Sequence, residues 1–164
     1  MTSLKNEIEG TWKLLSYIEL PVGGSDSCFP MGKSPKGLLL FTPDGYMAVQ
    51  IAPSEDASFK SGDKLQATDE EYIHRGKTFI AFSGKYQVNN ITACVEYQIQ
   101  TSLYPNWEGT TQVRKLDFEG DVLYQKSLEP ILSNGQQVYA YMTWQRVTAL
   151  SDAGEYEEVL NNTY

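Results

Sequence analysis

The chain has 164 residues, of which 41% are hydrophobic, 12% aromatic and 21% charged. This composition excludes a disordered or collagen-like chain, and no apolar run approaches the roughly 18 residues that a membrane-spanning helix needs. The 21 Asp and Glu residues outnumber the 13 Lys and Arg residues, and the net charge of -8 disfavours a surface that binds nucleic acid through its phosphates. The length suits a single domain over residues 1–164.

The start of the chain lacks the basic stretch and apolar segment of a secretory signal, so we expect a cytoplasmic protein with no membrane partner. Cys28 and Cys94 are far apart and show no CxxC or His spacing of the kind that holds a metal. A reducing compartment keeps such residues as thiols. We therefore expect no metal site and assign both cysteines to packing or to the surface.

Short runs of Val, Ile, Tyr, Phe, Trp and Thr alternate with clusters of Gly, Pro, Asn and Asp along most of the chain. This pattern predicts eight β-strands, over residues 11–19, 37–42, 46–51, 78–88, 91–101, 111–118, 122–127 and 137–147. Turn-forming residues at 43–45, 89–90 and 120–121 favour antiparallel pairing of consecutive strands. We expect an all-β, eight-stranded, antiparallel up-and-down barrel, because closure removes both sheet edges; an open β-sandwich is the alternative.

Two connections, residues 20–36 and 52–77, are long enough to act as lids over the mouth of such a barrel. The second connection contains a predicted short helix, with Thr68 as its N-cap, acidic residues in its first turn and Gly76 at its end. The barrel core should span residues 10–147 and be followed by an acidic C-terminal tail over residues 148–164.

Alternation along three strands predicts which side chains point into the barrel. In the sixth strand, three charged residues from Lys115 to Glu119 must face water, which places Gln112, Arg114, Leu116 and Phe118 inside. The same argument places two further sets inside, namely Ile80, Phe82, Gly84, Tyr86 and Val88 in the fourth strand and Ala93, Val95, Tyr97 and Ile99 in the fifth. The first three strands show no such clear alternation.

Arg114 stands out among the residues predicted to lie inside. An eight-stranded barrel either is filled by its own side chains or holds one small ligand, and a buried guanidinium is costly unless it is paired. Arg114 could therefore anchor a carboxylate, enolate or carbonyl oxygen of a ligand. Alternatively, it lies near a barrel end, where it reaches water or pairs with an acidic residue.

Gly10-Thr11-Trp12 on the first strand and Trp144-Gln145-Arg146 on the last resemble the lipocalin pattern, in which a terminal Arg packs over the Trp at the closed end. Residues 35–47 and 102–114 resemble, more specifically, the intracellular lipocalin-like domain family of bacteria and fungi. The resemblance covers residues 10–147 and implies a calyx for a hydrophobic molecule. Members look like accessory proteins of secondary metabolism, and related barrels include cofactor-free cyclases and isomerases.

The candidate bases are few. A His-rich stretch that often precedes the second of these segments in the family is replaced here by Tyr97 and Gln98. His74, the only His, could act as a base over the mouth or be a solvated side chain on the short helix. Glu96 is either exposed or, if the fifth strand faces the other way, a base or the partner of Arg114. No phosphate loop, nucleophile elbow or metal cluster occurs, so we expect no cofactor.

Tyrosine hydroxyls could bind a developing oxyanion while their rings line the cavity, although sheet packing explains most of them. Trp107 is either a rim residue or a plug, whereas Trp12 and Trp144 should pack the closed base. The candidate catalytic residues are thus Arg114, Tyr97, Glu96 and His74, and the candidate ligand-binding residues are Tyr46, Phe82, Tyr86, Gln98, Trp107, Gln112, Leu116 and Tyr141.

Our leading interpretation is a cofactor-independent isomerase or cyclase of natural-product metabolism that acts on a hydrophobic, oxygenated small molecule. Aromatic walls would hold the substrate, and Arg114 with a Tyr would stabilise negative charge on its oxygen. The alternative is a non-catalytic carrier with the same pocket. Nothing in the sequence decides between a monomer and a homodimer formed through exposed strands.

Overall fold

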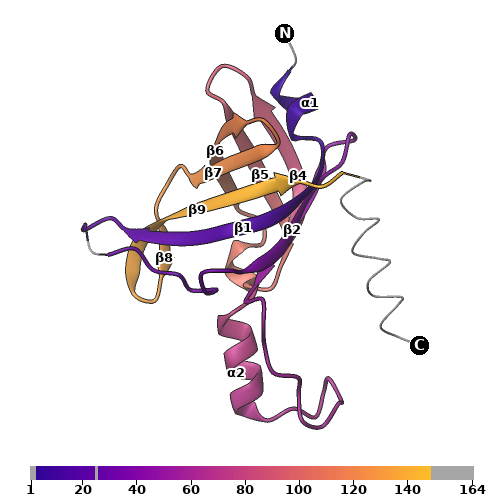
Figure 1. Cartoon of the computed structure of the whole chain (residues 1–164), viewed down its shortest axis with the longest axis vertical. Helices are drawn as coiled ribbons and strands as arrows, with labels where there is room; N and C mark the ends of the chain where they lie inside the picture. The colour runs from indigo at the N-terminus through magenta and orange to yellow at the C-terminus, as the bar shows by residue number, and fades with distance from the viewer. Residues whose placement is uncertain (1–2, 25, 149–164) are drawn as a thin grey trace.

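The computed structural model, which describes residues 3–24 and 26–148, is a closed antiparallel β-barrel (Figure 1). Its strands are β1 (Gly10–Pro21), β2 (Lys36–Phe41), β3 (Tyr46–Ala52), β4 (Ile80–Asn89), β5 (Cys94–Ser102), β6 (Thr111–Glu119), β7 (Val122–Ser127), β8 (Ile131–Ser133) and β9 (Gln136–Arg146). Consecutive strands pair from β1 to β7, β7 pairs with β9, and β9 pairs with β1. The predicted eight-stranded barrel is therefore confirmed, and the short β8 is an additional strand on β9.

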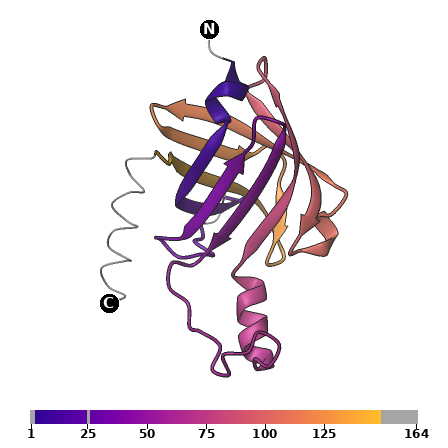
Figure 2. The same cartoon turned by 90° about the vertical axis from the view of Figure 1, so that its right-hand side faces the viewer.

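Three short helical segments accompany the barrel. Helix α1 (Leu4–Ile8) lies at one end, the 3-10 turn η1 (Pro105–Trp107) joins β5 to β6, and α2 (Asp69–Lys77) projects from the other end (Figures 1 and 2). Thr68 caps α2 as expected, in a capping box with Glu71, whereas Gly76 lies within the helix. None of the helices in the described parts of the chain is long and apolar enough to cross a membrane.

The long connection that carries α2 does not close the barrel as a lid. Figure 2 shows α2 extending away from the strands, and none of its residues is buried. It is tied instead to its own loop, where the Tyr72 hydroxyl donates to the Lys64 carbonyl at 2.7 Å and Arg75 pairs with Asp56 at 3.2 Å. The other long connection does reach the barrel interior, because Met31 is 4% exposed and packs into the core.

The closed end is built around Trp12, which is fully buried. Its indole N–H donates to the Ile8 carbonyl at 2.8 Å, so α1 caps this end of the barrel. The guanidinium of Arg146 lies 4.2 Å from the centroid of a Trp12 ring and donates to the carbonyl of Glu9 at 2.9 Å. Gly10 has a φ of 118°, which L side chains rarely adopt, and a Cβ there would lie 3.3 Å from Arg146 Nη1.

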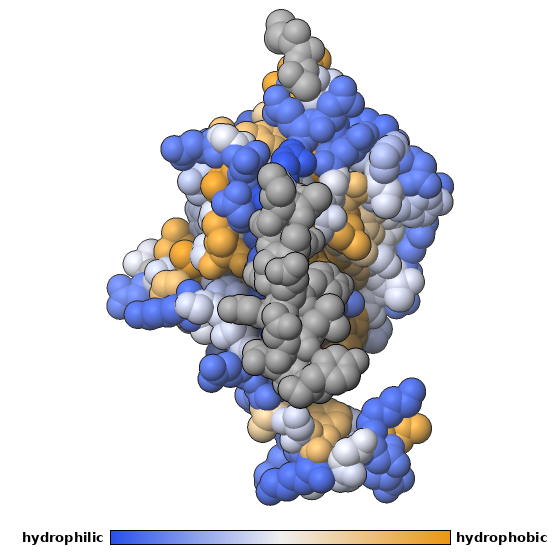
Figure 3. All heavy atoms as spheres, turned by 45° about the vertical axis from the view of Figure 1, so that its right-hand side comes forward, coloured by the Kyte–Doolittle hydropathy of each residue, from blue (hydrophilic) through white to orange (hydrophobic). Residues whose placement is uncertain are grey.

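Burial follows the alternation predicted for β4, β5 and β6. Most of their inward set is buried, while the outer surface mixes polar side chains with apolar patches (Figure 3). The buried members include Phe82, Tyr86, Val95, Tyr97, Ile99, Arg114 and Leu116, and Ile80, Val88, Gln112 and Phe118 are half-buried. Ala93 is an exception to the prediction, because it precedes β5 in a turn and has a φ of 53°. Gly84 lies beside a bulge in the β4–β5 pairing, where a Cβ would come within 1.9 Å of the Gln98 carbonyl oxygen.

A second bulge changes which side chains of β1 face inward. The β1–β9 register shifts between Leu14 and Ser16. Before the shift, Trp12 and Leu14 are buried, and after it Tyr17 is the buried residue. An extra residue in one strand reverses the inside and outside faces that follow. The shift therefore brings Tyr17 and, two residues later, Glu19 to the interior.

Candidate functional site

A cavity of about 160 Å³ lies inside the barrel, and its lining includes Lys77, the last residue of α2, and Ile80, the first residue of β4. Its wall is mainly apolar and includes Leu39, Val49, Ile51, Phe82, Trp107 and Met142. An apolar cavity of similar size, roughly 150 Å³, can hold benzene. The cavity is therefore suited to a molecule built around a single ring rather than to a long lipid.

Arg114 places a positive charge in this wall. The residue is 5% exposed, and its Nη2 atom donates to Gln112 Oε1 at 2.6 Å. Its Nη1 atom makes a longer contact of 3.4 Å with the Val113 carbonyl, and the guanidinium carbon lies 5.8 Å from the centroid of the Tyr97 ring. Burial lowers the pKa of the guanidinium, which nevertheless stays charged because arginine starts from so high a value. Within the described residues Arg114 forms no ion pair, and both of its hydrogen-bond partners, Gln112 and the Val113 carbonyl, are neutral.

Tyr97 and two further buried side chains form a hydrogen-bonded chain beside Arg114. Gln125 Nε2 donates to the Tyr97 hydroxyl oxygen at 2.8 Å, and Trp144 Nε1 donates to Gln125 Oε1 at 3.0 Å. Burial raises the pKa of Tyr97 to about 12, although the charge of Arg114 opposes the shift. The phenol is therefore neutral at physiological pH. The hydroxyl oxygen of Tyr97 accepts the hydrogen bond from Gln125, so the hydroxyl proton of Tyr97 is available to an oxygen atom of a ligand.

A second polar pair, Tyr17 and Glu19, lies in the wall contributed by β1. The Tyr17 hydroxyl donates to Glu19 Oε1 at 2.9 Å. Burial and then the negative charge of Glu19 raise the pKa of Tyr17, while Arg114 acts in the opposite direction. Tyr17 thus stays protonated and lies within electrostatic range of both the carboxylate and the guanidinium.

The cavity wall contains four of the residues proposed from sequence, namely Arg114, Tyr97, Phe82 and Trp107. Trp107 belongs to the rim, where its ring meets Phe82 edge-on at 5.8 Å between centroids. Gln112 contacts the cavity indirectly, through its hydrogen bond to Arg114. Two other proposed residues, Tyr86 and Leu116, are buried in the core but outside the cavity lining.

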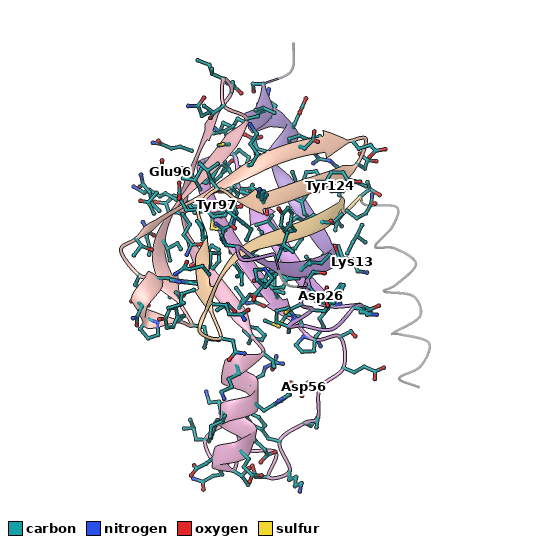
Figure 4. All side chains as sticks on the ribbon, turned by 90° about the vertical axis from the view of Figure 1, so that its left-hand side faces the viewer. Lys13, Asp26, Asp56, Glu96, Tyr97 and Tyr124 are labelled. Carbon is teal, nitrogen blue, oxygen red and sulfur yellow. The ribbon has the colours of Figure 1, made fainter. Side chains whose placement is uncertain are left out.

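Several proposed ligand contacts lie on the outer face of the barrel instead. Tyr46 is 44% exposed, Gln98 is exposed, and Tyr141 lies on the face of β9 opposite to its buried neighbours. Glu96 also points outward, whereas the adjacent Tyr97 points inward (Figure 4). Because successive residues of a strand alternate between faces, the suggestion that Glu96 pairs with Arg114 is wrong.

His74 lies on α2, away from the cavity wall. Its side chain is 60% exposed, and its Nε2 atom lies 3.2 Å from Asp56 Oδ1. This contact links α2 to the loop that precedes it. The structure thus places His74 with the solvated side chains of the helix rather than over the mouth of the barrel.

Sequence reasoning missed Tyr17, Glu19, Gln125 and Trp144 as parts of the cavity wall. The signal for Gln125 was present, because it alternates with the buried residues Leu123 and Ser127 of β7. No comparable signal reveals Glu19, since its inward orientation depends on the bulge after Leu14.

The described residues contain no group of three or more His, Cys, Asp and Glu side chains that could hold a metal ion. Both cysteines are free thiols, with Cys28 exposed and Cys94 buried. The charged groups of the cavity lining are therefore the Arg114 guanidinium, the Glu19 carboxylate and the ammonium group of the exposed Lys77, and its other polar groups are neutral hydroxyl, amide and indole groups.

Comparison with known proteins gives two findings. The lipocalin-like domain family matches the chain over residues 9–147. The 4'-hydroxy-3'-methoxypropiophenone carrier protein of Aspergillus oryzae is 29% identical over 111 residues, which are 64% of this chain and 100% of that relative. The matched family region contains every strand of the barrel and every polar residue of the cavity wall.

Proposed function

Because the chain belongs to the lipocalin-like domain family, we propose that it is a carrier that binds one small, mainly apolar, oxygenated molecule inside its barrel. The observation that carries this proposal is Arg114, a buried cation in a mainly apolar cavity, with which no carboxylate of residues 3–24 and 26–148 forms an ion pair. A charge in such a place is costly to the fold unless a ligand atom compensates for it.

The arrangement of donors indicates how the ligand would bind. The guanidinium of Arg114 and the Tyr97 hydroxyl both offer protons to one oxygen atom, and a hydrogen bond from a charged donor is the stronger kind. The rings of Phe82 and Trp107 would pack against the apolar body of the ligand. A carbonyl, phenolate or carboxylate oxygen next to an aromatic ring meets these requirements.

The relative from Aspergillus oryzae suggests a concrete probe. Its name states that it carries 4'-hydroxy-3'-methoxypropiophenone, which is an aryl ketone with a single ring. The aromatic ring of such a molecule suits a cavity of about 160 Å³ with a hydrogen-bond donor in its wall. We therefore propose an aryl ketone, as an intermediate of natural-product metabolism, as the ligand class.

A cofactor-independent isomerase or cyclase is the second candidate function. The same Arg114–Tyr97 pair would stabilise an enolate, and the enclosed apolar wall would exclude water. However, both bases proposed from sequence, Glu96 and His74, lie outside the cavity wall. An enzyme of this kind would have to use Glu19 of the cavity wall as its base, and the carrier is favoured because the relative from Aspergillus oryzae is named a carrier protein.

Titration of the purified protein with the aryl ketone tests both candidates. Trp107 and Trp144 line the cavity, so a bound ketone should quench the intrinsic fluorescence in a saturable way. The ketone should then be recovered unchanged by chromatography with accurate mass. Arg114→Met should weaken binding by roughly 10- to 150-fold, which corresponds to the loss of a charged hydrogen bond of about 1.5–3 kcal/mol.

Lys115→Met is the matched control, because Lys115 is the next residue of β6 and points to solvent. Its affinity for the ketone should equal that of the wild type. Equal affinity of the Arg114→Met variant would refute the proposed anchor. A new product with the same mass as the ketone would show that the protein is an isomerase or cyclase and not a carrier.

A further inference from the structure

We propose that Glu19 is a second polar anchor in the cavity, so that the protein selects neutral ligands carrying a hydroxyl group as well as the oxygen bound by Arg114. This inference rests on the proposed carrier function and specifies its ligand class. The two anchors would hold the ligand in a single orientation, with a hydrogen-bond acceptor at Arg114 and a donor at Glu19.

The carboxylate of Glu19 is held in position but retains a free acceptor atom. Its side chain is half-buried in the cavity wall, and Oε1 accepts the hydrogen bond from Tyr17. In the described part of the chain, Oε2 has no hydrogen-bond donor and Glu19 forms no ion pair. The backbone of Glu19 is fixed as well, because its N–H and C=O groups both pair with Cys28. A ligand hydroxyl could therefore donate to Oε2 without displacing a protein group.

The strand register places Glu19 and Arg114 in one row across the barrel wall. Glu19 lies opposite Ala140 on β9, and Arg114 lies opposite Ser127 on β7. The Ala140 N–H donates to Ser127 Oγ at 2.9 Å, which connects the two halves of the row. Neighbouring strands are about 4.8 Å apart, so three strand spacings, or roughly 14 Å along the curved wall, separate the two backbones. Only short side chains lie between the two long ones.

The charges of the row distinguish ligands that have similar shapes. Arg114 attracts any oxygen acceptor, including a carboxylate, but the half-buried negative charge of Glu19 on the same wall disfavours a second anion, and the charge of Lys77 in the lining is exposed to solvent. A neutral molecule with a carbonyl and a hydroxyl group satisfies both side chains. We therefore expect hydroxyaryl ketones to bind more tightly than aryl carboxylates or ketones without the hydroxyl.

The test is calorimetric titration of the full chain with three probes, namely an aryl ketone, the same ketone with a ring hydroxyl, and the corresponding aryl carboxylate. The wild type should bind the hydroxyaryl ketone about tenfold more tightly than the parent ketone, as expected for a hydrogen bond to a charged acceptor. Glu19→Leu should remove this preference, so that the two ketones bind with similar affinity, and should increase the affinity for the carboxylate.

Two further variants separate this role from a general effect on the fold. Glu96→Leu is the matched control, because it removes a half-buried carboxylate from the outer face of the barrel and should preserve the hydroxyl preference. Tyr17→Phe should reduce the ratio of the affinities for the hydroxyaryl ketone and the parent ketone, since Tyr17 positions the carboxylate. Glu19→Gln, which has nearly the same shape as the wild type, replaces Glu19→Leu if the latter does not fold.

A hydroxyl preference that survives in the Glu19 variants would overturn this inference. The proposed carrier function would then still stand, provided that ketone binding depends on Arg114. Absence of binding by all three probes to the wild type would overturn both proposals.

Discussion

Replacing Arg114 by methionine should leave the ligand-free protein at least as stable as the wild type. The substitution removes the bond to Gln112 at 2.6 Å, the long contact with the Val113 carbonyl and the stacking on Tyr97 at 5.8 Å. A charged hydrogen bond contributes about 1.5–3 kcal/mol, and a cation–π contact about 0.5–2 kcal/mol. Against these losses stands the desolvation of a guanidinium that is 5% exposed, which costs several kcal/mol. Methionine is a flexible apolar residue that fills the vacated space.

The lost contacts and the relieved desolvation together predict a free energy of unfolding that is unchanged or up to about 4 kcal/mol higher than that of the wild type. Such a result is found when buried charges are replaced by apolar residues. Urea unfolding followed by tryptophan fluorescence measures this difference through the midpoint concentration. Lys115→Met, at an exposed site, should stay within about 0.5 kcal/mol of the wild type. A loss of more than about 2 kcal/mol in Arg114→Met would show that Arg114 serves the fold rather than a ligand.

Three further predictions concern the framework of the barrel. Trp12→Ala should lower the free energy of unfolding by about 3–5 kcal/mol, because the ring is fully buried. Urea unfolding measures this loss, and a variant as stable as the wild type would contradict the prediction. Gly84→Ala should lower the free energy of unfolding by at least about 1–3 kcal/mol, since the added Cβ would lie 1.9 Å from the Gln98 carbonyl oxygen. Gly76→Ala should not lower it, because open space surrounds that position. The pKa of Tyr97, raised by burial to about 12, should make stability fall as the pH rises from about 10 to 12. Tyr97→Phe should flatten that decline in unfolding experiments at alkaline pH, and an unaltered pH profile would count against the raised pKa.

The direction of the pH effect follows from proton binding. Between the two pKa values the unfolded phenol has lost its proton while the folded one retains it. The contribution of Tyr97 to stability is therefore complete below about pH 10 and disappears as the pH rises through the folded value.

The barrel could be predicted because its strands alternate clearly and its hairpins carry recognisable turn residues. The predicted strand over residues 122–127 coincides with β7 (Val122–Ser127), and the neighbouring strands differ by only a few residues at their ends. Helix α1 and strand β8 escaped prediction, because segments of five and three residues carry too little periodicity. Both depend on tertiary pairing, as the Ile8–Trp12 hydrogen bond illustrates for α1.

The site could be predicted only where alternation was regular. Arg114 and Tyr97 were identified because charged or polar neighbours fixed the faces of β6 and β5. Tyr46 and Tyr141 were proposed from the chemistry of tyrosine alone, without a face assignment, and the structure places both outside the barrel. Glu19 could not be found at all, because no sequence feature indicates the register shift that turns it inward.

The most direct test of the central claim is a crystal structure of the protein with a bound hydroxyaryl ketone. We expect the ring inside the barrel, with one ligand oxygen about 2.7–3.1 Å from an Arg114 nitrogen and the ring against Phe82. A ligand bound elsewhere, such as in the groove between α2 and its loop, would contradict the proposed binding site. A ligand inside the barrel that makes no contact with Arg114 would contradict the proposed anchor.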